Sequence, residues 1–198
     1  MRIGTQNPSV RFVGYFAHSG HYQERDIAMT RDQKTVGIGA ASGVAAMIAA
    51  VSVIYQLWPT NLGLADGSSR LVYALQASAF AVLPLLIGIM MVGNDRFLSE
   101  AIDPTLQKED RATQINGRVV ENTLQQFVMF LVGTLALSVN LTAEQMRAIP
   151  AVVIVFIVAR ILFWVGYRIH PLYRAFGMAA TGYLNVGILA LALWKVLH

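Results

Sequence analysis

Five long apolar stretches alternate with shorter polar segments along this chain. Each is close to the roughly 20 residues that a helix needs to cross the hydrocarbon core of a bilayer. Two of the stretches hold one charged residue each, Glu121 and Arg160, and the other three hold none. The period-two alternation of barrel strands is not seen, so the pattern predicts helices, which satisfy their backbone groups internally. The predicted spans are 36–58, 71–93, 119–141, 150–167 and 175–194.

The composition supports an all-α integral membrane protein. Charged residues make up 13% of the chain, against about 25% in soluble domains. The chain has no Cys, which excludes disulfides, thiolate metal sites and a cysteine nucleophile. The net charge of +4 comes without a basic run, so we expect contacts with membrane lipids and not with nucleic acid. The four histidines fall in loops or at the C-terminus, so we expect no metal site.

The loop charges predict the orientation. With the N-terminus in the cytoplasm, 12 of the 15 Lys and Arg residues lie on the cytoplasmic side, and only Arg70, Arg147 and Lys195 lie outside. This is the distribution that the positive-inside rule describes. We therefore expect a bacterial inner-membrane protein with its C-terminus outside. The polar arm 1–35 is expected to lie on the cytoplasmic membrane surface.

A polar stripe enters the third span. Its residues are spaced three or four apart, so they share one face of a helix. Within it, Arg118 and Glu121 are spaced to form an ion pair. The stripe is either a pocket at the cytoplasmic mouth of the bundle or a solvated extension of the helix. It comprises Arg111, Gln114, Arg118, Glu121 and Gln125, with Asn122 beside it.

A second polar cluster surrounds the end of the fourth span. Arg160, Phe163 and Tyr167 share a helical face, Pro171 ends the helix, and Arg174 precedes the last span. Arginines at helix ends often reach toward lipid headgroups, but Arg160 lies seven residues inside the span. Both clusters fall on the cytoplasmic side, so together they predict a site for an anionic polar ligand.

Small residues indicate where helices pack closely. Gly39 and Gly43 have the small-xxx-small spacing, which serves either packing within the bundle or a dimer seam. The three glycines of the last span, Gly177, Gly182 and Gly187, are also expected to permit close packing.

Two blocks resemble the MAPEG superfamily, the membrane-associated proteins in eicosanoid and glutathione metabolism. VENTLQQF places Glu121 and Asn122 where the family has Glu-Asn or Glu-Tyr. ARILFWVGYRIHPLYR is similar to the family's Ala-Arg, Gly-Tyr and, seven residues later, Arg. The resemblance covers 71–198 and implies a four-helix bundle, with 36–58 as an additional N-terminal transmembrane helix.

The resemblance also implies a ligand and an assembly. Family members are homotrimers that bind glutathione at the cytoplasmic side, between subunits. Arg174 matches the arginine that holds the glutathione thiolate and is the expected catalytic residue. The other expected glutathione contacts are Arg111, Gln114, Arg118, Glu121, Asn122, Arg160 and Tyr167. The sequence departs from the family at two places. It has Gln114, Asn116 and Arg118 where the family has Arg, Gln or His, and Asn, and Phe163 lacks the hydroxyl of a tyrosine found in some members.

Two functions follow from this resemblance. The first is a glutathione-dependent transferase or peroxidase acting on lipophilic electrophiles, with glutathione as cosubstrate and no metal. The second is a non-catalytic member of the same fold, which binds lipid or serves as an accessory membrane protein. A transporter or channel is disfavoured, because the sequence shows no inverted repeat, broken helix or mid-bilayer charge pair.

Overall fold

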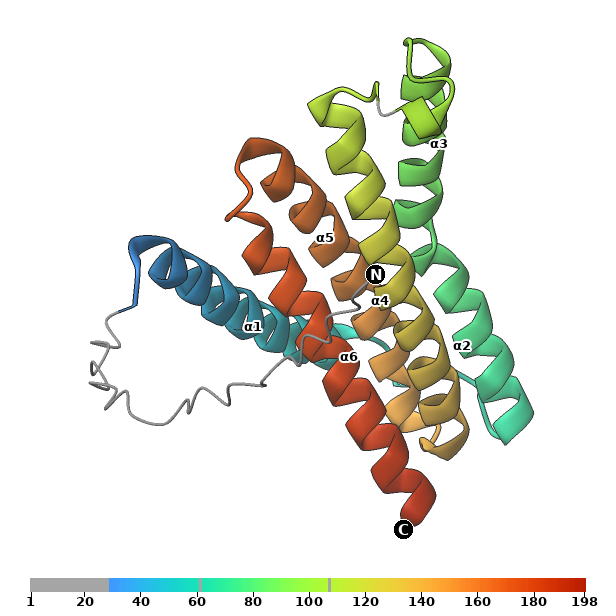
Figure 1. The fold of residues 1–198 in the computed structure, drawn as a ribbon. Helices are drawn as coiled ribbons and strands as arrows, with labels where there is room; N and C mark the ends of the chain where they lie inside the picture. Colours follow the sequence, from blue (N-terminus) through green and yellow to red (C-terminus); the bar gives the residue numbers. More distant parts are fainter. Residues whose placement is uncertain (1–28, 61, 107) are drawn as a thin grey trace, which may run out of the picture.

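Helices make up the regular structure of the computed structural model, which describes residues 29–60, 62–106 and 108–198 (Figure 1). No strand occurs in these ranges, and the all-α prediction is confirmed. Most of the predicted N-terminal arm lies outside the described residues. The helices are α1 (Arg31–Leu57), α2 (Gly67–Ala81), α3 (Leu83–Phe97), α4 (Arg111–Asn140), α5 (Ala148–Ile169) and α6 (Arg174–Leu197), with short 3-10 turns η1 (Pro104–Leu106) and η2 (Glu144–Arg147).

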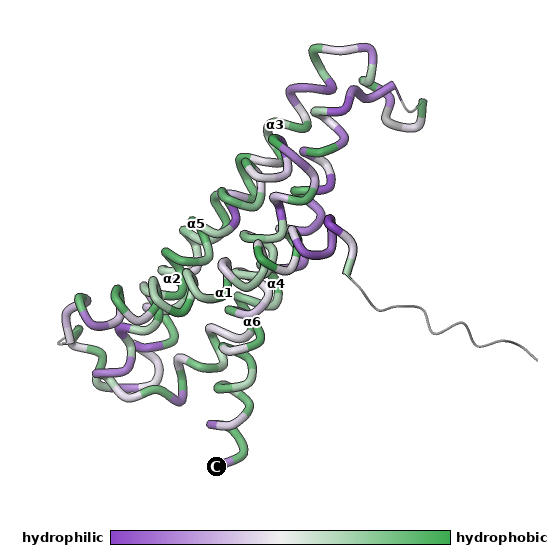
Figure 2. Tube along the Cα trace, turned by 90° about the vertical axis from the view of Figure 1, so that its left-hand side faces the viewer, coloured by the Kyte–Doolittle hydropathy of each residue, from purple (hydrophilic) through white to green (hydrophobic). Residues whose placement is uncertain are grey.

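Among the described residues, five segments are long and apolar enough to cross a membrane, as the sequence predicts. They are Arg31–Leu57, Gly67–Phe97, Arg111–Asn140, Glu144–Ile169 and Arg174–Leu197. Hydrophobic residues fill the middle of the molecule, and hydrophilic residues collect toward its ends (Figure 2). We call one end the Arg174 end; it holds the start of α1, the α3–α4 connection and the α5–α6 turn. The opposite Trp58 end holds the end of α1, the start of α2, the α4–α5 connection and the C-terminus.

The second span is broken, whereas the sequence pattern predicted one uninterrupted helix. α2 ends at Ala81 and α3 begins at Leu83, with Pro84 in the first turn of α3. Proline has no N–H to donate and crowds the preceding turn, which explains the break. Ala81, Pro84 and Leu85 are buried, so the interruption faces protein, where the membrane tolerates it.

Glycines bring α1, α5 and α6 together. A Cβ at Gly43 would lie 2.2 Å from the Phe176 backbone oxygen, so α1 lies directly against α6 of the same chain. This favours the bundle-packing interpretation of Gly43 over a dimer seam. A Cβ at Gly177 would lie 2.4 Å from the Phe163 nitrogen, so α5 and α6 are equally close. Gly182 and Gly187 do not form such a contact within this chain, because no described atom lies within 4 Å of a Cβ built there.

Aromatic and aliphatic side chains of α4 and α5 form the core. The rings of Phe130 and Phe156 lie 4.4 Å apart between centroids, and both side chains are fully buried. Met146 and Ile149 extend this core to the Trp58 end, and Ile188 adds α6 to it. The Arg174 end is packed differently, through the polar side chains described below.

Asp110 caps α4 at the Arg174 end and gives this end an acid-sensitive contact. Its carboxylate accepts a hydrogen bond of 2.8 Å from the Thr113 backbone, and the pKa of Asp110 is lowered by the side-chain and backbone hydrogen bonds of Thr113, with a smaller contribution from the Arg168 charge. A lowered folded pKa means that the stabilisation is complete above the unfolded pKa and is lost as pH falls through the folded pKa.

We expect the unfolding temperature in detergent to fall on acidification by more in the wild type than in Asp110→Asn, which caps without titrating. Identical pH profiles for the two proteins would exclude this role.

Candidate functional site

Arg160 lies inside the bundle, in a cage of neutral oxygens. Its side chain is 1% exposed. One terminal nitrogen donates to the Thr181 hydroxyl at 3.1 Å, and the other donates to Asn122 Oδ1 and to the Thr123 hydroxyl, both at 3.0 Å. The guanidinium thus ties α5 to α4 and α6, and the structure brings together two predicted site residues, Arg160 and Asn122.

The two threonine hydroxyls have a local reason to face the arginine. Thr123 donates to the Val119 carbonyl at 2.6 Å, one turn back along α4. Thr181 donates to the Gly177 carbonyl at 2.8 Å, one turn back along α6. Each hydroxyl proton is therefore used within its own helix, which leaves the oxygen lone pairs to accept from Arg160.

An aromatic column leads from Arg160 to Arg174. The Arg160 guanidinium carbon lies 4.1 Å from the Phe163 ring centroid, and the Phe163 and Tyr167 rings are 6.0 Å apart. The Arg174 guanidinium then lies 4.8 Å from the Tyr167 centroid. Arg174 is exposed and is the first residue of α6, where the helix dipole adds positive potential. Three predicted site residues, Arg160, Tyr167 and Arg174, are therefore linked through Phe163 into one column.

The polar stripe of α4 forms a single face, as predicted, but this face points outward. All of its members are exposed: Arg111, Gln114, Arg118, Glu121 and Gln125. In the described part of the chain the ion pairs are Arg96–Glu109 and Lys108–Glu100, so the pairing allowed by the Arg118–Glu121 spacing is not formed. Because Glu121 is exposed while Arg160 is buried, a single chain does not enclose a ligand between these two side chains.

Asn116 joins three helices at the Arg174 end. It is fully buried. Its amide nitrogen donates to Asp95 Oδ2 at 2.9 Å, and its oxygen accepts from Trp164 Nε1 at 2.9 Å and from Arg168 at 3.3 Å. The position therefore holds α3, α4 and α5 together and has no free polar atom directed at solvent.

The inner polar face of α4 was not predicted from the sequence. Its members recur at helical spacing one or two positions away from the stripe, which is the signal that could have revealed them. Gln126 continues this face and accepts from the Asn185 amide through its side-chain and backbone oxygens, at 2.9 and 3.0 Å. The buried polar residues of α4 toward the Arg174 end are Thr113, Asn116, Thr123 and Gln126.

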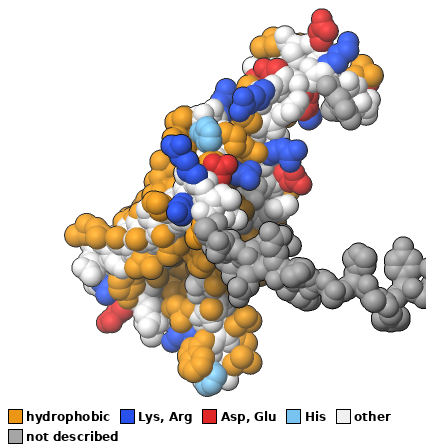
Figure 3. Space-filling view, turned by 60° about the vertical axis from the view of Figure 1, so that its left-hand side comes forward, with side chains coloured by type: hydrophobic (Ala, Val, Ile, Leu, Met, Phe, Trp, Pro, Cys, Tyr) orange, Lys and Arg blue, Asp and Glu red, His pale blue; other side chains and the backbone are white. Residues whose placement is uncertain are grey.

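Charged side chains of both signs gather at the end of the molecule that carries the candidate site. Figure 3 shows blue Lys and Arg side chains and a few acidic ones toward the top, above a largely orange surface. The exposed arginines that belong to the candidate site are Arg111, Arg118 and Arg174. The guanidinium groups of these three arginines can contact an anionic ligand directly.

Comparison with known proteins places these features in a family. The sequence model of the MAPEG family matches residues 42–194, beginning inside α1. Transmembrane protein 79 of Mus musculus is 25% identical over 131 residues, which cover 66% of this chain and 32% of the relative. Transmembrane protein 79 of Bos taurus is 26% identical over 128 residues, covering 65% and 31%. The chain thus spans about a third of the length of these curated relatives. No solved structure matches.

Proposed function

Because the chain belongs to the MAPEG family, we propose that it binds glutathione at the Arg174 end and transfers it to lipophilic electrophiles. The observation that supports this most directly is the aromatic column. It holds Arg174 at its exposed end and fixes Arg160 at its buried end. A guanidinium held in this way is a preorganised partner for a sulfur anion.

The chemistry follows from the charge on Arg174. A nearby guanidinium stabilises the thiolate of glutathione over the thiol and lowers the thiol pKa. The thiolate attacks the electrophilic carbon, a C–S bond forms, and the leaving group departs with the bonding electrons. Such electrophiles dissolve in the lipid and reach the site along the apolar surface of the spans. With a lipid hydroperoxide as substrate, the same thiolate attacks the terminal peroxide oxygen, the O–O bond breaks, and the lipid leaves as its alcohol after taking up a proton. A second glutathione then attacks the sulfenic acid that is left, which gives glutathione disulfide and water.

Because the α4 stripe points outward, the proposed function requires an assembly of several copies of the chain. Arg118 and Glu121 are exposed, so their carboxylate and amine contacts to the peptide require a second copy of the chain beside the column. A homotrimer, with the Arg174 end in the cytoplasm, meets this requirement. Arg160 and Asn122 then act by positioning the column, because the two terminal nitrogens of Arg160 and the Asn122 side-chain oxygen already form hydrogen bonds inside the bundle.

Arg174→Ala tests the proposal. We expect glutathione binding, measured by isothermal calorimetry in detergent, to weaken about tenfold or more through loss of a charge-assisted contact. Turnover of a chlorinated aromatic substrate should fall about 100-fold, because the thiolate loses its stabilising charge. Arg31→Ala is the matched control, since Arg31 is an exposed arginine at the same end on α1. Unchanged binding and turnover in Arg174→Ala would refute the role of Arg174.

A non-catalytic accessory or lipid-binding role is the second candidate. The observation in its favour is that the Asn116 side-chain amide and the two terminal nitrogens of Arg160 form their hydrogen bonds within the protein. If the wild-type protein binds no glutathione at millimolar concentration, this second function is supported and the transferase is rejected.

A further inference from the structure

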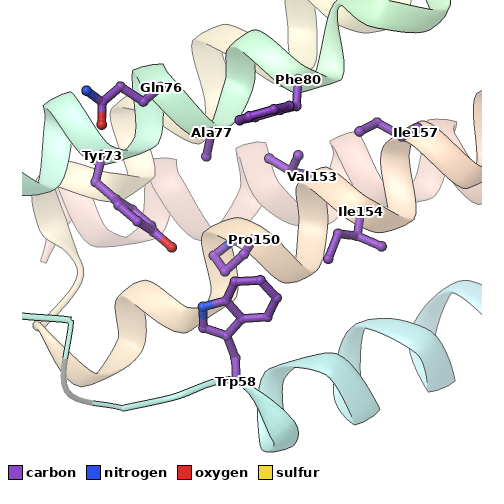
Figure 4. A pocket seen from close by; sticks show the side chains of 9 residues that line it. All are labelled: Trp58, Tyr73, Gln76, Ala77, Phe80, Pro150, Val153, Ile154 and Ile157. Atoms are coloured by element: carbon purple, nitrogen blue, oxygen red, sulfur yellow. The ribbon is translucent and has the colours of Figure 1, made fainter.

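A cavity opens toward the Trp58 end, at the opposite end of the bundle from Arg174, and nothing in the proposed chemistry uses it. It has a volume of about 430 Å³ and is bounded by the end of α1, by α2 and by the start of α5 (Figure 4). Its size falls within the range of about 300–1,000 Å³ typical of small-molecule sites. We infer that this cavity binds one single-chain anionic amphiphile, with its alkyl chain directed toward the middle of the bilayer.

The lining has a polar end and an apolar end. Trp58 and Tyr73 lie near the Trp58 end of the bundle, and the indole N–H and the phenol are their polar groups. Two helical turns further on, Phe80 of α2 and Ile157 of α5 line the apolar end. Since α2 and α5 both start at the Trp58 end, this distance is about 10 Å along the helices. A cavity that is polar near the membrane surface and apolar toward its centre matches a headgroup followed by an alkyl chain.

The cavity is accessible from lipid. Phe80 is 61% exposed and Ile154 is 36% exposed, although both line the cavity. These side chains therefore form a wall that opens sideways toward the hydrocarbon core. An alkyl chain can enter from the bilayer without passing through water.

Arg147 does not itself line the cavity, but it precedes the lining residues of α5 and brings a positive charge that favours an anionic headgroup. It lies one turn before Pro150, which lines the cavity, and its guanidinium carbon sits 4.1 Å from the ring centroid of Tyr55 on α1. Its Nε is buried and has no hydrogen-bond partner among the described residues. A buried donor without an acceptor is costly, and a carboxylate or phosphate beside it removes this cost.

Photo-crosslinking tests the inference on the full-length protein in nanodiscs. The probe is a palmitic acid that carries a diazirine on its chain, and labelled positions are read by peptide mass spectrometry. We expect saturable labelling concentrated on the α2 segment around Phe80 and the α5 segment 150–157. Unlabelled palmitate should compete, and its methyl ester should compete about tenfold less well, because it lacks the charge.

Two variants with the same substitution on one helix provide the matched control. Ala77 lines the cavity and Ala79 is an exposed residue of α2. Ala77→Phe should reduce the saturable labelling at least tenfold, whereas Ala79→Phe should leave it unchanged. Arg147→Gln should remove the preference for palmitate over its ester. Arg174→Ala should change nothing here, so that this site and the glutathione site fail or succeed separately.

Three results would overturn the inference. The first is non-saturable labelling spread evenly over the lipid-facing positions of all helices, as ordinary surrounding lipid gives. The second is equal competition by palmitate and its methyl ester. The third is equal labelling of the Ala77→Phe and Ala79→Phe proteins. The first measurement uses the unaltered chain, so it holds even if a variant fails to fold.

Discussion

Adding one methyl group at Gly43 is expected to destabilise the protein by about 2 kcal/mol, because a close-packed contact cannot accept extra volume. In Gly43→Ala the new Cβ would meet the Phe176 backbone at 2.2 Å. Backbone atoms cannot rotate away as a flexible side chain can, so α1 and α6 must separate. The effect should grow in Gly43→Leu. Unfolding in mixed micelles containing SDS, followed by the helical circular dichroism signal, measures the loss.

Gly37→Ala is the matched control for this prediction. Gly37 lies on the same helix, and a Cβ there would approach only the Met29 side chain, at 3.9 Å. Alanine is a better helix former than glycine by about 1 kcal/mol. We therefore expect Gly37→Ala to be neutral or stabilising. Equal losses in the two variants would show that the contact between α1 and α6 does not stabilise the chain.

Arg160→Ala is expected to cost about 3–5 kcal/mol, since it removes the side chain that joins three helices. It leaves a cavity, and it leaves Asn122 Oδ1 without the donor that satisfied it. Arg160→Met should cost much less, about 1 kcal/mol, because methionine refills the space and no charge remains to be desolvated. The threonine hydroxyls keep the hydrogen bonds to their own helices in both variants.

Arg168→Ala is the control that shows whether the loss of an exposed arginine also lowers the stability. Arg168 is exposed, and the structure gives it one side-chain hydrogen bond, to Asn116 at 3.3 Å. Its removal should change stability by less than about 1 kcal/mol. The two Arg160 variants also have an outcome that would contradict the prediction. If Arg160→Met lowers the stability as much as Arg160→Ala does, the positive charge itself stabilises the fold, and a cage of neutral oxygens does not explain the role of Arg160.

The hydrophobic pattern predicted the spans because lipid imposes one simple requirement on length and polarity. The same pattern could not predict the break at Val82, since the apolar run continues through it and the proline effect depends on which neighbours cover the exposed backbone. It also could not tell Gly43 from Gly37. Both are glycines on one apolar helix, and only the packing of α6 makes one of them irreplaceable.

The sequence predicted the residues of the candidate site better than it predicted their arrangement. Periodicity grouped the α4 stripe correctly, but period alone does not say which face of a helix turns inward. The inner face is set by the core, which includes Phe130, and by Arg160, whose guanidinium needs oxygen acceptors. Thr123 and Thr181 meet that need from two different helices. Such a pairing depends on the relative depth of α4 and α6 in the bundle, which no local pattern encodes.

The break between α2 and α3 also bears on how the protein fits membranes of different thickness. The two helices together span 31 residues, about 46 Å if straight, whereas the hydrocarbon core is about 30 Å thick. A rigid rod of that length must tilt strongly or carry polar residues into lipid. The joint at Val82 lets α2 and α3 take different directions while both stay packed against α4, to which Asp95 of α3 is bonded through Asn116. Hydrophobic mismatch is thereby absorbed by bending in one arm, and α4, α5 and α6 can keep their relative depth.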